Sequence, residues 1–259
     1  MSSPIWTPAA LSSEACVYAG AGWRLVEAQH RVSTLKLVDS LAEQALLEDI
    51  LEETKPAVPL ECQHLDYLLS TPFRYGATYP HGSRFRRAGK TPGVYYAAER
   101  PETAAAEMVF YRFLFYAESP ATPFPDDAAE YTAFSVDLQA ERSIDLTTDP
   151  LVQDSGHWTH PTDYIACQAL ADAAREAGED LIRFQSVRDP GAGANLAVLT
   201  CSAFASREPV ERQTWRIRVG SHGAQAIREY PALGLELPRN AFANDPRLAT
   251  LNWERGKTK

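Results

Sequence analysis

The hydrophobic pattern along the chain changes period several times, and each change predicts a different element. In "TWRIRVG" (214–220), Trp215, Ile217 and Val219 alternate with Arg216 and Arg218, which predicts a strand with one buried face. Other short segments rich in β-forming residues also predict strands. They are "GWRLVEAQ" (22–29), "GVYYAA" (93–98), "AAEYTAFSVDL" (128–138) and "RSIDL" (142–146) split by "QAE", "LIRFQS" (181–186) and "LAVLTCSAF" (196–204).

Three longer segments have helical periodicity: "LVDSLAEQALLEDILEETKP" (37–56), "ERPETAAAEMVFYRFLFY" (99–116) and "HPTDYIACQALADAAREAGED" (160–180). Pro101 and Pro161 suit the first turns of the second and third, and Gly178 suits the end of the third. On the first, apolar residues share one side: Leu37, Leu41, Ala45, Leu46 and Ile50. Because strands and helices are mixed without regular alternation, the pattern predicts an α+β fold.

No linker divides residues 1–259, so we expect a single domain with its core at about 22–220. Residues 36–56 are expected to form a helical insertion or cap on it. The tail beyond "YPALGLELP" (230–238) is expected to be peripheral.

The formal net charge of −9 disfavours direct binding to nucleic acid, although one cleft can still be basic. The chain has no apolar run of membrane-spanning length and no secretory signal at its start, so we expect a cytoplasmic protein without a membrane partner. Its four cysteines, Cys16, Cys62, Cys167 and Cys201, are widely spaced, as is typical of free thiols in a reducing compartment. Neither "CQH" nor "HWTH" has enough partners nearby for a metal site.

Four arginines, Arg74, Arg84, Arg86 and Arg87, lie within fourteen positions of one another. In "GSRFR", strand alternation puts Arg84 and Arg86 on one face. A solvated edge with salt bridges explains this pattern. A pocket for a diphosphate explains it equally, because guanidinium groups bind phosphate in a bidentate manner.

Adjacent tyrosines in "GVYYAA" point to opposite faces of the strand, so only one of them can line a pocket.

Glu107 lies among alanines near a helix start, where a carboxylate is kept ionised. There it could stabilise positive charge on a sugar ring, or simply face solvent. Ser186 precedes a glycine-rich loop, where it could bind a ligand or cap a turn. That loop is not a Rossmann motif, since a strand is expected after it. Neither a GxSxG nor a P-loop motif is present.

In order, "GWR", "GSRFRRAG", "VYYAAERPETAAAE" and "LIRFQSVRDPGAGANLAV" resemble the RES-domain toxins of bacterial toxin–antitoxin pairs. The resemblance covers residues 22–220. It implies an ADP-ribosyltransferase-like fold, a mixed or antiparallel β core with surrounding helices, acting on NAD without a metal.

By the same resemblance, the site residues are Arg24, Tyr96, Glu107 and Ser186. Arg24, with Arg74 or Arg84, would hold the diphosphate, and Tyr96 would stack on nicotinamide while Tyr95 is core. Glu107 would stabilise the oxocarbenium-like transition state, and Ser186 would orient the amide or ribose. Ser83 in "GSR" and the following "FRR" depart from the family pattern, so the roles of Arg84, Arg86 and Arg87 stay open.

The implied function is a toxin that cleaves the nicotinamide–ribose bond of NAD and passes the ADP-ribosyl group to water, phosphate or a protein acceptor. The implied partner is a cognate antitoxin of the Xre type. The altered "GSRFRR" turn supports an alternative, a non-catalytic member that only binds nucleotide or a partner protein. A structural or DNA-associated module is disfavoured by the acidic balance.

Overall fold

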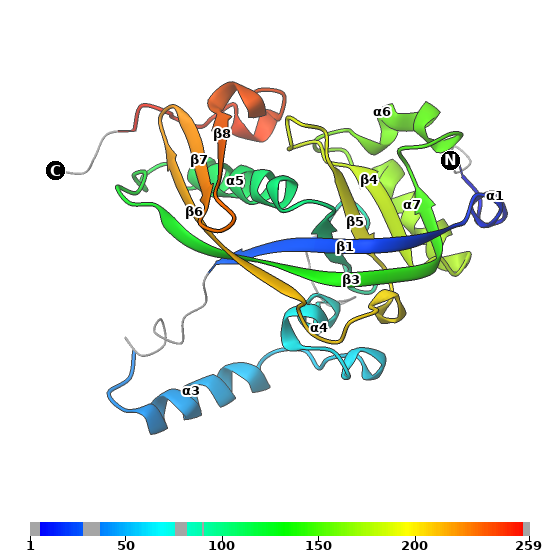
Figure 1. The fold of residues 1–259 in the computed structure, drawn as a ribbon, viewed down its shortest axis with the longest axis horizontal. Coiled ribbons are helices and arrows are strands. Elements are labelled where there is room, and N and C mark those ends of the chain that lie inside the picture. Colours follow the sequence, from blue (N-terminus) through cyan, green and yellow to red (C-terminus); the bar gives the residue numbers. More distant parts are fainter. Residues whose placement is uncertain (1–5, 28–36, 76–81, 90, 256–259) are drawn as a thin grey trace.

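A computed structural model describes residues 6–27, 37–75, 82–89 and 91–255 of the chain. Its centre is a mixed sheet in the order β1-β2-β5-β4-β3-β6-β7-β8, with an additional pairing between β1 and β3. Helices lie around this sheet (Figure 1). The expected sheet core with surrounding helices is therefore confirmed.

Two long strands, β1 (Cys16–Glu27) and β3 (Ala129–Asp145), run antiparallel beside each other and organise the sheet (Figure 1). The other strands are β2 (Tyr95–Ala98), β4 (Leu181–Gln185), β5 (Ala194–Val198), β6 (Glu211–Gly220), β7 (Gly223–Arg228) and β8 (Leu233–Pro238). Pairings β1–β2, β2–β5, β5–β4, β4–β3 and β3–β1 close a ring, in which only β3–β4 is parallel. β6, β7 and β8 extend the sheet from β3.

The expected split between two strands at "QAE" is wrong, because β3 is continuous there. Leu138 and Ala140 are buried, while Gln139 and Glu141 face solvent. The polar residues thus belong to the exposed face of one long strand.

The main helices are α1 (Pro8–Ser13), α3 (Leu41–Glu53), α4 (Tyr67–Arg74), α5 (Pro101–Glu118), α6 (Ser155–Trp158) and α7 (Ile165–Glu176). The 3-10 helices are η1 (Leu60–Cys62), η2 (Leu151–Asp154), η3 (Cys201–Ala203), η4 (Arg239–Phe242) and η5 (Pro246–Leu248). Pro101 occupies the first turn of α5, as expected. Pro161 instead precedes α7, which begins at Ile165. Gly178 follows α7 with a φ of 77°, the left-handed conformation that glycine adopts freely, so the expected end is confirmed.

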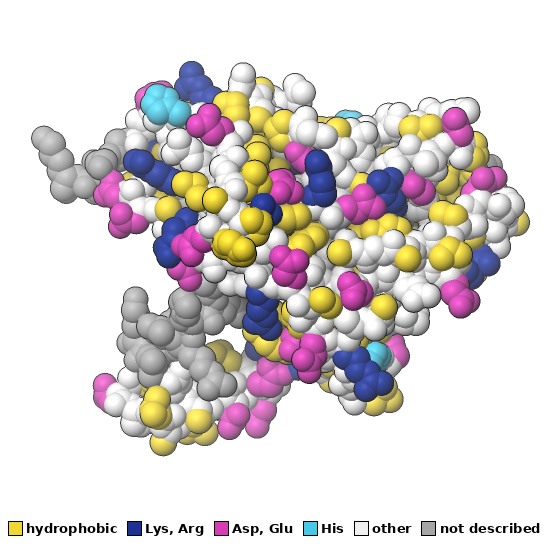
Figure 2. Space-filling view, viewed as in Figure 1, with side chains coloured by type: hydrophobic (Ala, Val, Ile, Leu, Met, Phe, Trp, Pro, Cys, Tyr) yellow, Lys and Arg dark blue, Asp and Glu magenta, His cyan; other side chains and the backbone are white. Residues whose placement is uncertain are grey.

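Helix α3 protrudes from the body, and its expected apolar side does not face a core. Leu41, Leu46 and Ile50 are exposed, and Figure 2 shows hydrophobic and acidic side chains together on this protruding part. An ion pair between Glu52 of α3 and Arg74 of α4 joins it to the body.

Three buried clusters hold the rest together. One lies between α5 and strands β1, β6, β7 and β8, a second between α7 and β4, and a third inside the strand ring, under α4. Phe242, Leu248 and Leu251, beyond β8, are buried in the first cluster with Phe110 and Phe113 of α5. The segment that was expected to be peripheral therefore packs on this helix.

The expectation of free thiols is wrong for two of the four cysteines, because Cys62 and Cys201 form a disulfide. It joins η1 to η3 across 139 residues of sequence, so spacing gave no sign of it. Cys16 and Cys167 are free thiols. None of the helices among the described residues is long and apolar enough to cross a membrane.

Candidate active site

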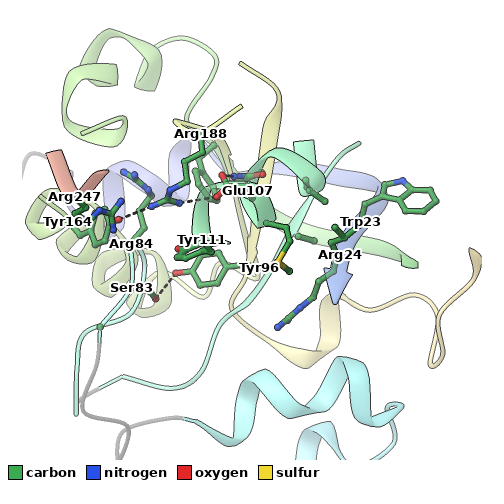
Figure 3. A pocket seen from close by; sticks show the side chains of 18 residues that line it. Trp23, Arg24, Ser83, Arg84, Tyr96, Glu107, Tyr111, Tyr164, Arg188 and Arg247 are labelled. Atoms are coloured by element: carbon green, nitrogen blue, oxygen red, sulfur yellow. Dashed lines mark hydrogen bonds and ion pairs between the residues drawn. The ribbon is translucent and has the colours of Figure 1, made fainter. Parts of the chain in front are cut away.

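A cavity of about 440 Å³ is lined by residues of both β1 and β2. These strands share a single register pair, Trp23 with Ala98. The cavity wall also includes the turn at 82–84, α5, and residues that follow β4 (Figure 3). Arg24, Arg84, Tyr96 and Glu107, four of the six expected site residues, line this one cavity.

Glu107 lies in the second turn of α5, whose preceding residues are small and buried: Ala104, Ala105 and Ala106. These alanines let the helix lie close to the sheet, so a carboxylate on it reaches residues at the strand ends. Oε1 of Glu107 accepts hydrogen bonds from Ser186 Oγ and Asn195 Nδ2, both at 2.7 Å. Oε2 pairs with Nη1 of Arg188 at 3.0 Å. Three donors thus fix the carboxylate at the cavity wall.

Ser186 caps a turn, which is one of the two roles that its position suggested, and it also contacts Glu107. Its hydroxyl donates to Glu107, and it accepts from the backbone amides of Arg188 at 3.2 Å and Asp189 at 3.1 Å. It caps the turn after β4 while holding the carboxylate. At 1% exposure Ser186 lies behind the cavity wall and is not part of its lining, and among the lining side chains its hydroxyl contacts Glu107.

The glycine-rich loop that carries these donors is fastened to the start of α5. Asp189 Oδ2 accepts from Thr103 Oγ1 at 2.7 Å and from the amide of Gly193. A Cβ at Gly193 would lie 2.2 Å from Thr103 Oγ1, so only glycine allows this approach. The loop therefore docks with Ser186 and Asn195 directed at Glu107.

Tyr96 lines the cavity, whereas Tyr95 is buried in the core cluster inside the strand ring. The Tyr96 hydroxyl lies 2.8 Å from Ser83 Oγ and accepts from the amide of Phe85 at 3.0 Å. Burial raises the pKa of Tyr96 to about 12, so the hydroxyl is neutral at physiological pH. Ser83 thus fixes the tyrosine.

Arg24 lines the cavity from β1 and points away from Glu107 (Figure 3). Its guanidinium lies 5.2 Å from the ring centre of Tyr95, and no carboxylate among the described residues pairs with it. Burial lowers the pKa of Arg24, since desolvation disfavours its charged form. An unneutralised guanidinium in a cavity is an attractive site for an anion.

The other arginines of the sequence cluster have different surroundings. Arg84 is buried and donates to the carbonyls of Trp158 (2.6 Å) and His160 (3.0 Å), which leave its charge unneutralised. Arg87 pairs with Asp172 of α7 at 2.6 Å, and Arg86 is buried. Arg74 pairs with Glu52 and lies outside the cavity lining.

Several lining residues were not singled out from the sequence: Tyr111, Tyr164, Arg188, Asn195 and Arg247. Arg188 and Asn195 belong to the motif "SVRDPGAGAN", so motif membership was the available signal. Nη2 of Arg188 also donates to the Tyr164 hydroxyl at 3.0 Å. No three His, Cys, Asp or Glu side chains form a metal-binding group within the described part of the chain.

Together, the sheet, its helices and this cavity define a mixed α/β protein with a carboxylate-centred site. The sequence profile of the RES domain family matches residues 58–220, and the chain belongs to this family. A search of curated proteins found no match. Among solved structures, the chain is similar to one entitled "Crystal structure of the M.tuberculosis MbcT-MbcA toxin-antitoxin complex", with 14% identity, a TM-score of 0.45, and coverage of 78% of this chain and 90% of that chain.

Proposed function

We propose that this protein is the toxin of a toxin–antitoxin pair and cleaves the nicotinamide–ribose bond of NAD. The observation that carries the proposal is the Glu107 carboxylate, fixed by Ser186, Asn195 and Arg188 at the wall of a cavity that Tyr96 also lines. Membership of the RES domain family supports it, since the sequence motifs resemble those of RES-domain toxins.

In the proposed reaction, the bond between the nicotinamide nitrogen and the ribose anomeric carbon breaks, and its electron pair goes to the nitrogen. The positive pyridinium thereby becomes neutral nicotinamide, and the ribose becomes oxocarbenium-like. Glu107 stabilises that charge. Water, phosphate or a protein nucleophile then attacks the anomeric carbon and loses a proton, which completes ADP-ribosyl transfer.

The cavity residues have the chemistry that these roles need. Tyr96 offers a flat ring and a hydroxyl that Ser83 and Phe85 orient, which suits stacking against nicotinamide. Ser186 acts through Glu107 by holding its Oε1. Arg24 and Arg84 lack a carboxylate partner among the described residues, so each is a candidate for the diphosphate.

A binding-only member of the family is the second candidate. The ion pair between Arg188 and Glu107 favours it, because a neutralised carboxylate stabilises an oxocarbenium ion less. In that case the chain would hold NAD without releasing nicotinamide. Under either function, the resemblance to RES-domain toxins implies a cognate antitoxin, of the Xre type, as partner.

The deciding experiment compares nicotinamide release from NAD by the wild type, Glu107→Gln and Glu102→Gln. Glu102 is a matched control, because it lies on the same helix and pairs with Arg228 at 3.6 Å instead of lining the cavity. We expect Glu107→Gln to lose about 100-fold or more of the turnover and Glu102→Gln to keep it. Growth arrest on expression should follow the same order. NAD binding by calorimetry without release in the wild type would instead support the binding-only function.

A further inference from the structure

We propose that the C-terminal segment supplies a substrate-binding residue, Arg247, which together with Arg84 contacts the diphosphate of the substrate. This inference rests on the proposed function, since it takes NAD as the ligand. It assigns the diphosphate to one side of the cavity and gives a role to residues beyond the range 58–220 that the family profile matches.

Arg247 enters the cavity wall because its segment is packed on the helix that carries Glu107. Leu248 and Leu251 are buried against α5 in the first cluster. The guanidinium of Arg247 lies 4.9 Å from the ring centre of Phe110 of α5. The tail thus brings a cation to the wall of the cavity that Glu107 also lines.

The orientation of this guanidinium is fixed. Nε and Nη2 of Arg247 donate to the two oxygens of Asp245, at 2.9 and 2.6 Å, and Nη2 also donates to the Pro161 carbonyl at 3.2 Å. Asp245 is itself buried and caps η5 through the amide of Arg247. The remaining nitrogen, Nη1, makes no hydrogen bond with any described residue. A donor held in this way binds a ligand oxygen with little loss of side-chain entropy.

Arg84 and Arg247 reach the same place from distant parts of the sequence. Arg84 donates to the carbonyl of His160, and Arg247 donates to that of the next residue, Pro161. The Arg84 guanidinium lies 4.7 Å from the ring centre of Tyr164. In Figure 3, Arg84, Tyr164 and Arg247 lie together on one side of the cavity, and Arg24 lies on the other.

The charge on this side favours an anion. Three guanidinium groups lie on this side of the cavity, those of Arg84, Arg188 and Arg247. Among the described residues, Glu107 pairs with Arg188 and Asp245 pairs with Arg247. Within the described chain, Arg84 donates only to carbonyl groups and a thiol, which do not neutralise its charge. One positive charge is left in a partly enclosed space. Arg188 connects this group of arginines to Glu107, which is proposed to act at the ribose. The excess positive charge therefore lies next to the proposed ribose position, and in NAD the diphosphate is joined directly to this ribose.

The test uses substrates that differ in phosphate. Nicotinamide riboside has the scissile bond and no phosphate, whereas NAD has both. We expect Arg247→Met to lower kcat/KM for NAD by about tenfold or more, because the substitution removes a hydrogen bond to a charged group. We expect kcat/KM for the riboside to fall much less. Arg255→Met is the matched control. Arg255 lies in the same tail, donates to the carbonyls of Tyr116 and Thr122, and lies outside the cavity lining.

The inference would be overturned if Arg247→Met lowered kcat/KM equally for NAD and the riboside, or lowered neither. It would also be overturned if Arg255→Met showed the same difference between the two substrates. Calorimetry with ADP-ribose tests the role of Arg247 separately from the proposed reaction, because binding of ADP-ribose needs no turnover. If the wild type binds ADP-ribose through Arg247 but releases no nicotinamide, the proposed reaction fails and the inference stands. If nicotinamide is released and ADP-ribose affinity is the same in Arg247→Met, the inference fails alone. No binding and no release would reject both.

Discussion

Ser186 Oγ lies 2.7 Å from Oε1 of Glu107, although 79 residues separate them in sequence. Ser186 directly follows β4 and Glu107 is on α5, so the contact depends on the docking of a loop against a helix. The serine is almost fully buried. Its hydroxyl is therefore expected to affect catalysis by holding the carboxylate.

Ser186→Ala should lower nicotinamide release by about ten- to 100-fold, because the removed hydrogen bond has an ionised acceptor. A double-mutant cycle with Glu107→Gln tests the mechanism. If Ser186 acts through Glu107, its removal in the Glu107→Gln background should cost little more. Fully multiplicative losses would show that Ser186 acts on the substrate by itself.

Gly193→Ala should detach the glycine-rich loop from α5. The added methyl group would lie 2.2 Å from Thr103 Oγ1 and 2.6 Å from Asp189 Oδ2, and Thr103 is fully buried. We expect a loss of about 1–3 kcal/mol in the free energy of unfolding, together with a loss of turnover. Urea unfolding and nicotinamide release measure the two effects. Gly156→Ala is the control, because nothing lies within 4 Å of its added methyl group. A Gly193→Ala protein with wild-type stability would contradict the loop docking.

Much of this arrangement could be predicted where local chemistry decides it. Pro101 marked the start of α5, and alternation in β6 placed Trp215, Ile217 and Val219 in the core. The motif order brought Tyr96 and Glu107 into one site. Local sequence predicted the apolar side of α3 equally clearly, yet Leu41 and Leu46 are exposed, because periodicity does not reveal whether a partner surface is present.

The rest could not be predicted because it depends on long-range packing. Nothing near Arg247 in the sequence indicates that Leu248 and Leu251 bury themselves against α5 and bring its guanidinium to the cavity. Arg74 lies in the same sequence cluster as Arg84, but its side chain pairs with Glu52 on α3. Proximity in the sequence therefore groups Arg74 with Arg84, whereas the structure places Arg84 in one cavity with Arg24 and Arg247.

The Tyr96 hydroxyl should make stability depend on pH in the alkaline range. Burial raises its pKa from 10 to about 12 in the folded protein, so between these values the folded state holds a proton that the unfolded state has lost. The contribution of the Tyr96 proton to the free energy of unfolding is complete below pH 10 and is lost as the pH rises towards 12. Urea unfolding should show a steeper fall in stability over this range for the wild type than for Tyr96→Phe. Parallel curves would mean that Tyr96 has an ordinary pKa.

Arg24 offers a contrast between stability and function. It is desolvated, and no carboxylate among the described residues compensates its charge, so it costs stability that a neutral side chain of similar length would restore. Arg24→Met should raise the free energy of unfolding by about 1 kcal/mol, a few degrees in Tm, while it lowers NAD turnover. Thermal unfolding and nicotinamide release on the same preparation test both.

Arg84→Met is the informative control for Arg24→Met. Arg84 donates to the carbonyls of Trp158 and His160, so its loss leaves buried acceptors unsatisfied and should lower stability. The two arginine variants should therefore change Tm in opposite directions, while both impair turnover of NAD. A fall in Tm for Arg24→Met as large as that for Arg84→Met would mean that Arg24 is a structural residue. In that case its unneutralised charge would not indicate a role in substrate binding.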